Sequence, residues 1–185
     1  HSTWGPVKKF YREVMGLDEK KIPAFYDHFD VEALQKFIDG HKVAIQRQKD
    51  RGDTHIFSAC VVIDDLADDF SVQKASGSLL PQLFIKGRHW QISCLVAVQK
   101  LSLTSTVVRS NATGALLFKS TAQEFDNLDR DSRPSGMDKK TFRSIFMTAT
   151  RDPYSFLWIK LNSKDDSDTV SYTHLTLPTT GIVLV

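Results

Sequence analysis

The sequence predicts an α/β domain with a mainly parallel central sheet flanked by helices. Apolar runs of strand length alternate with segments of helical period along most of the chain. The run at 58–63, SACVVI, has no polar alternation, which is typical of a strand that is covered on both faces in a parallel sheet. With 185 residues, of which 41% are hydrophobic and 25% charged, the chain has the length and composition of about one globular domain.

Each expected element follows from local pattern. Helices are predicted where apolar residues recur every three or four positions, as Val7, Phe10 and Val14 do. The crossover after the first strand is expected to be helical or irregular and interrupted at Gly77 and Pro81. In chain order we expect helices over 7–17 and from 31 to 51, a strand at 58–63, the crossover at 71–87, a strand at 90–99, a short turn or helix at 104–111, a strand at 114–120, helices over 122–132 and 137–152, and a strand at 155–161.

Composition and charge exclude several classes of protein. The net charge of +2 is too small to indicate a strong basic field for nucleic acid, although local patches are compatible with it. No apolar run approaches the roughly 18 residues of a membrane span, and no secretion signal opens the sequence. The two cysteines, Cys60 and Cys94, lie in apolar runs, so we expect two buried thiols rather than a disulfide or a metal site.

The two ends of the sequence do not resemble those of a complete protein. The first residue is His1 rather than methionine. The segment TVSYTHLTLPTT (169–180) has neither helical nor strand period and resembles the conceptual translation of a sequencing adapter. We therefore expect a partial natural domain over 1–168, open at both ends, and a non-native tail over 169–185.

Polar side chains follow two of the predicted strands. Asp64 and Asp65 come directly after the first, and Gln99 ends the second. Ligands of open parallel sheets bind beyond the carboxyl ends of the strands. A carboxylate there suits Mg²⁺, a second can orient or activate a water molecule, and an amide can bind a phosphate oxygen. The alternative is that the acidic pair is only the polar turn by which the chain leaves the sheet, with Asp68 and Asp69 beginning the next helix.

The order of these pieces resembles a known family. Asp64–Asp65 are followed by Gly87–Arg88–His89, by an apolar strand ending in Gln99, by Arg109–Ser110–Asn111 and by the apolar run ALLF. This order is similar to that of the genome-packaging ATPases of large nucleocytoplasmic DNA viruses, a poxvirus-type branch of the FtsK–HerA superfamily of P-loop NTPases. The resemblance covers residues 55–160 and implies a partial RecA-like (ASCE) P-loop domain.

The resemblance also implies residue roles, with ATP and Mg²⁺ as cofactors. Asp64 would hold the metal through water, Asp65 would position the attacking water, and Gln99 would sense the γ-phosphate. Arg88 is the first choice and Arg109 the second for an arginine that reaches the nucleotide of a neighbouring subunit, because a cation there stabilises the charge that develops in phosphoryl transfer. The alternatives are a surface cation for Arg88 and a partner of a local carboxylate for Arg109.

The sequence departs from the family in two places. It contains no G-x-x-x-x-G-K-[ST] phosphate-binding loop, which we expect upstream of His1, and Leu103–Thr104 stand where a Leu-Pro pair is expected. Without the loop, the 185 residues are predicted neither to bind ATP tightly nor to hydrolyse it.

The implied function is that of an ATP-driven translocase that packages viral DNA into capsids. Its partners would be double-stranded DNA, further copies in a homo-oligomeric ring, and capsid or portal proteins, in the virion or the cytoplasm of the infected host. Two alternatives stay open: another P-loop ATPase of helicase or signalling type, and a non-catalytic α/β binding domain. The basic clusters Lys8–Lys9–Arg12 and Lys139–Lys140–Arg143 are interpreted as solvated helix faces.

Overall fold

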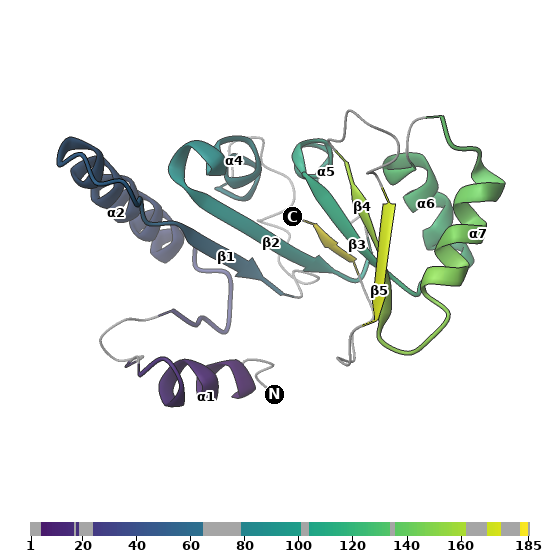
Figure 1. Ribbon diagram of the computed structural model, residues 1–185, viewed down its shortest axis with the longest axis horizontal. Helices are drawn as coiled ribbons and strands as arrows, with labels where there is room; N and C mark the ends of the chain where they lie inside the picture. The colour runs from purple at the N-terminus through teal and green to yellow at the C-terminus, as the bar shows by residue number, and fades with distance from the viewer. Residues whose placement is uncertain are drawn as a thin grey trace.

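A computed structural model of the chain shows helices arranged around one six-stranded sheet with the order β1-β2-β6-β3-β4-β5 (Figure 1). The structure describes residues 5–16, 18, 24–64, 79–100, 104–133, 136–161, 170–174 and 182–184. The helices are α1 (Gly5–Glu13), α2 (Val31–Asp50), α4 (Leu79–Lys86), the 3₁₀ helix η2 (Gly87–Trp90), α5 (Thr106–Asn111), α6 (Ala122–Ser132) and α7 (Lys139–Ala149). The strands are β1 (Ala59–Ile63), β2 (Ile92–Val98), β3 (Gly114–Phe118), β4 (Ser155–Lys160), β5 (Val170–His174) and β6 (Ile182–Leu184).

The α/β class is confirmed, but the expectation of a mainly parallel sheet is wrong for the described strands. Only β1 and β2 pair in parallel, while β2–β6, β3–β6, β3–β4 and β4–β5 are antiparallel. Because β6 runs antiparallel to both β2 and β3, these two strands share the direction of β1. The strand predicted at 155–161 forms β4 and runs the opposite way, since it pairs directly with β3.

Apolar side chains from both the helices and the strands form the core. The largest fully buried side chains include Ile38 of α2, Val96 of β2, Leu117 of β3 and Phe142 of α7. On the side of α6 and α7, the ring of Phe125 packs against Phe142 and Phe146, with centroids 5.6 and 5.3 Å away. A single buried cluster therefore connects the β1–β2 pair to the β3–β4 pair.

Side-chain caps fix where the helices begin. The carboxylate of Asp30 accepts a hydrogen bond from the Ala33 amide at 2.9 Å at the start of α2. Thr121 and Asp138 cap α6 and α7 in the same way. Pro81 was expected to interrupt the crossover, but it lies in the first turn of α4. Proline is tolerated there because the amides of the first turn have no hydrogen-bond acceptor within the helix. Gly77 lies outside the described residues.

The first strand is less covered than its sequence predicts. Ala59, Val61 and Ile63 face the core, whereas Cys60 and Val62 point away from it and are exposed, Val62 by 48%. The expectations that 58–63 is covered on both faces and that Cys60 is buried are therefore wrong. The reason is that β1 is an edge strand of the sheet, and no described helix lies in front of it in Figure 1.

Two of the strands come from the segment 169–185, which the sequence analysis set aside as foreign. β6 inserts between β2 and β3, pairing with Val96–Val98 on one side and Ala115–Leu117 on the other. β5 extends the sheet beyond β4. Within the described part of the chain, no helix is both long and apolar enough to cross a membrane.

Candidate functional site

Two of the predicted site residues, Asp64 and Gln99, follow neighbouring parallel strands at the same edge of the sheet. Asp64 follows β1, and Gln99 follows β2. The register pairs Ile63 with Val96, so Asp64 falls one step further along, level with Ala97. With strands about 4.8 Å apart and a rise of about 3.3 Å per residue, the Asp64 and Gln99 Cα atoms are roughly 8 Å apart. Both residues are exposed, so a carboxylate and an amide can face one ligand there.

The chemistry of this edge is that of hard oxygen ligands. Among the described residues no group of three or more His, Cys, Asp or Glu side chains could hold a metal ion. Mg²⁺ does not require such a group, because it keeps several waters and binds through one or two carboxylates together with substrate phosphates. The exposed carboxylate of Asp64 could supply one such oxygen ligand, and its metal-binding role stays a prediction. Asp65, the predicted orienter of water, lies outside the described residues.

Arg88 and Gln99 lie at opposite ends of strand β2. It belongs to η2, which directly precedes β2, whereas Gln99 directly follows that strand. The seven residues of β2 span roughly 23 Å. The Arg88 side chain is exposed, and no hydrogen bond or ion pair to another described residue holds it. Arg88 is therefore too far away to serve a nucleotide bound at Asp64 of its own chain.

Close backbone packing explains the glycine before Arg88. Gly87 is buried, and a Cβ atom at this position would lie 2.5 Å from the carbonyl oxygen of Ile92. The turn closes at Gln91, which has a left-handed backbone (φ 54°). His89, to which the sequence analysis assigned no chemistry, is exposed on the same turn. Gly87 thus has a structural role that requires no ligand.

Arg109 is half-buried and held by its own loop. Its Nη1 donates a hydrogen bond to the carbonyl oxygen of Thr104 at 2.5 Å, and its Nη2 donates to Thr106 Oγ1 at 3.4 Å. Like Arg88, it lies before a strand rather than after one, since α5 directly precedes β3. The structure therefore separates both arginines from the acid–amide edge. The two hydrogen bonds to Thr104 and Thr106 hold the Arg109 guanidinium against a backbone and a hydroxyl acceptor of its own loop.

The basic clusters have ordinary surface partners. Lys139 Nζ lies 2.8 Å from Asp126 Oδ1, and the Arg143 guanidinium lies over the Phe125 ring at 5.4 Å. On α1, Lys9 lies 3.8 Å from a Glu13 carboxylate oxygen. These contacts agree with solvated helix faces.

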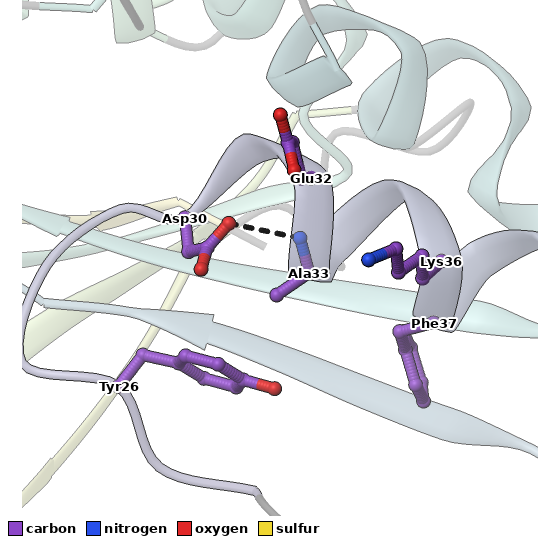
Figure 2. A pocket seen from close by; sticks show the side chains of 6 residues that line it. All are labelled: Tyr26, Asp30, Glu32, Ala33, Lys36 and Phe37. Atoms are coloured by element: carbon purple, nitrogen blue, oxygen red, sulfur yellow. Dashed lines mark hydrogen bonds between the residues drawn. The ribbon is translucent and has the colours of Figure 1, made fainter.

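A surface hollow that the sequence analysis did not identify lies at the start of α2 (Figure 2). It has a volume of about 440 Å³ and is lined by Tyr26, Asp30, Glu32, Ala33, Lys36 and Phe37. In this hollow, a carboxylate oxygen of Asp30 already accepts the hydrogen bond from the Ala33 amide that caps α2. The sequence signal was the aromatic stretch AFYDHFD, but none of the predicted site residues lines the hollow.

The two thiols have different surroundings. Burial raises the pKa of Cys94 to about 12, with a smaller contribution from Cys60. Burial also raises the pKa of Cys60, although this residue is exposed at the surface. Both cysteines are free, and neither is poised as a thiolate nucleophile at neutral pH.

Comparison with known proteins gives two viral relatives. The chain is 24% identical over 148 residues to the uncharacterized protein 075L of Invertebrate iridescent virus 6. This match covers 77% of this chain and 53% of that protein. It is 32% identical over 106 residues to the uncharacterized protein 088R of Invertebrate iridescent virus 3. This second match covers 56% of this chain and 38% of that protein. No family model and no solved structure matches. The chain thus spans about half the length, or less, of these two viral relatives.

Proposed function

We propose that the chain is part of an ATP-driven DNA translocase that packages viral genomes. The observation that carries the proposal is the meeting of Asp64 and Gln99 at the carboxyl edge of two adjacent parallel strands. Asp64 would hold Mg²⁺ through water, Asp65 would orient the attacking water, and the Gln99 amide would bind the γ-phosphate. The viral origin of both relatives agrees with the family that the sequence resembles.

The position of Arg88 supports a role between subunits. A free guanidinium at the far edge of the sheet cannot reach the nucleotide of its own chain, but it is available to a neighbouring copy in a ring. An arginine supplied in this way stabilises the charge of the transferred phosphoryl group. Arg109 is the weaker candidate because its guanidinium is already bound to Thr104 and Thr106.

The remaining parts of the motor would come from the rest of the polypeptide. The phosphate-binding loop and its lysine are absent from these 185 residues, and both relatives are longer than the segment they share with this chain. We therefore assign metal binding and γ-phosphate sensing to these 185 residues. The loop that cradles the phosphates is assigned to sequence outside them.

Magnesium-dependent ATP hydrolysis by the full-length protein tests this proposal. We expect Asp64→Asn to lower kcat by on the order of 100-fold or more, because the metal loses its anionic ligand. Asp50→Asn, an exposed carboxylate at the end of α2, is the matched control and should leave kcat unchanged. The 185 residues alone should show no hydrolysis. An unaffected Asp64→Asn enzyme would leave a non-catalytic α/β domain as the better interpretation, whereas hydrolysis by the short chain would contradict the assignment of the phosphate cradle to sequence outside it.

A further inference from the structure

The turn that carries Arg88 is held against the helix α2 by two side chains. The ammonium group of Lys42 lies over the Trp90 ring, 4.1 Å from its centroid. One residue earlier on the same helix, Nε2 of His41 lies 3.4 Å from the carbonyl oxygen of Gln91 and can donate a hydrogen bond to it. Both contacts join segments that are distant in the sequence, so they fix the position of η2 relative to α2.

Each of these two side chains is itself fixed on α2. One oxygen of the Asp39 carboxylate accepts a hydrogen bond from Gln35 at 2.8 Å, and the other lies 3.4 Å from Lys42 Nζ. The Gln35 hydrogen bond and, to a smaller extent, Lys42 hold the pKa of Asp39 below its ordinary value. The His41 ring stacks on Phe37, with centroids 5.7 Å apart and planes inclined by 15°. The helix therefore presents a placed cation and a placed ring to η2.

The two contacts act on Arg88 through the backbone of its turn. The carbonyl oxygen of Arg88 accepts a hydrogen bond from the Gln91 amide at 3.3 Å, and Gln91 has the left-handed backbone that closes the turn. Before the arginine, Gly87 lies so close to the carbonyl oxygen of Ile92 that no side chain fits there. After it, Trp90 is partly buried against the core. The turn is thus held on both sides of Arg88, and the exposed guanidinium extends from a fixed base.

We propose that Lys42 and His41 are positioning residues for Arg88 and set the direction in which its guanidinium leaves the subunit. This inference rests on the proposed function, in which Arg88 stabilises the phosphoryl group bound by a neighbouring copy. Such stabilisation depends on preorganised geometry, and a misplacement of about 1 Å can cost up to about 100-fold in rate. Contacts on α2 that touch neither nucleotide nor metal would therefore affect hydrolysis.

Hydrogen exchange tests the hold of α2 on the turn. In the full-length protein without nucleotide, Lys42→Gln should speed exchange of the Gln91 amide by roughly two- to fivefold, because this amide is bonded to the Arg88 carbonyl and opens with the turn. His41→Phe keeps an aromatic ring but loses the hydrogen bond to Gln91, so it should act in the same direction.

Two control variants separate this effect from a general loss of charge or of stability. Lys42→Arg keeps a cation over the indole ring and should keep the exchange rate of the parent. Lys49→Gln removes an exposed lysine in the last turn of α2 and should also have no effect. Because the Lys42 side chain is 37% exposed, Lys42→Gln should leave the midpoint of urea unfolding nearly unchanged.

Steady-state ATP hydrolysis by the full-length protein tests the consequence for Arg88. Lys42→Gln should lower kcat roughly tenfold and leave KM nearly unchanged, because the affected arginine serves the transition state rather than the binding of ATP. Lys42→Arg should restore kcat. In an Arg88→Ala background, Lys42→Gln should cause no further loss, since it acts only through the arginine.

Three results would overturn the proposal. The first is an unchanged exchange rate of the Gln91 amide in Lys42→Gln. The second is faster exchange with an unchanged kcat in a protein whose kcat does fall in Arg88→Ala. The third is a further loss when Lys42→Gln is added to Arg88→Ala. If Arg88→Ala itself leaves kcat unchanged, the role of the arginine fails and this inference fails with it, whereas Asp64→Asn decides separately whether the proposed ATPase stands.

Discussion

Gly114, the first residue of β3, lies directly against the indole ring of Trp158 in β4. A Cβ atom on Gly114 would come within 2.0 Å of Trp158 Cη2 and 2.5 Å of its Cζ2. The register pairs Trp158 with Leu116, so the ring reaches diagonally across the sheet to the glycine. The absence of a side chain at 114 is therefore a condition for the packing of this strand pair.

Gly114→Ala should destabilise the protein. The added methyl group forces the Trp158 ring out of its place, and overpacking of this kind costs about 1–3 kcal/mol of the free energy of unfolding. Urea unfolding followed by tryptophan fluorescence measures the loss. If Gly114→Ala unfolds at the same urea concentration as the parent, the indole does not occupy the position described.

Gly40→Ala should have the opposite effect. Gly40 lies inside α2, and a Cβ atom there would meet no other atom within 4 Å. Alanine restricts the unfolded chain more than glycine does, so we expect a gain of about 0.5–1 kcal/mol. The same unfolding measurement checks the sign, and a loss of stability would show that the surface around 40 is occupied.

Stability should fall at alkaline pH because of Cys94. Its pKa is raised from the ordinary value of 9.0 to about 12 in the folded protein, so the unfolded chain releases this proton first. The contribution is complete below pH 9 and is lost as pH rises toward 12, at up to about 1.4 kcal/mol per pH unit. Lysines and tyrosines titrate in the same range, so the useful quantity is the difference between the parent and Cys94→Ala. A difference that does not change between pH 8 and 10.5 would contradict the buried thiol.

The ion pair between α6 and α7 should be visible in the titration of Asp126. The hydrogen bond and charge of Lys139 hold the pKa of Asp126 below its ordinary value. Its contribution to stability is therefore present above the pKa of an unfolded aspartate and is lost as pH falls through the lower folded value. In Lys139→Gln, the Asp126 carboxyl carbon should titrate at higher pH by NMR, whereas Lys140→Gln should leave it unchanged.

Removal of 169–185 should weaken the sheet. Val96–Val98 and Ala115–Leu117 would lose the backbone partners that β6 provides, and β4 would lose β5. We expect a lower midpoint of urea unfolding and faster hydrogen exchange at the amides of β2 and β3. A shortened chain as stable as the parent would show that the segment is dispensable, as its foreign character in the sequence predicts.

Local pattern located most elements but not their directions. The apolar runs at 58–63 and 90–99 form β1 and β2 because a short run of consecutive apolar residues, several of them β-branched, suits a buried strand. The direction of β4 depends instead on which strand its backbone meets, and this is set by tertiary contacts. The exposure of Cys60 could not be predicted for the same reason, because an apolar run does not say whether both of its faces find partners.

The candidate site was predictable to a similar extent. Residues that directly follow two adjacent parallel strands must lie at one edge, so the sequence places Asp64 near Gln99 once the pairing is known. The separation of Arg88 from that edge follows from its place before β2 rather than after it. The bond from Arg109 to the Thr104 carbonyl has no signal in the sequence, because any backbone oxygen could have accepted it.

The insertion of β6 between β2 and β3 also governs how the protein can be made. β6 fills the middle of the sheet, so a nascent chain on the ribosome cannot complete this strand order until residues 182–184 have been synthesised. Until then the edges of β2 and β3 display unpaired amides and carbonyls, which can recruit strands from other chains. Slow synthesis or early termination should therefore favour aggregation over folding.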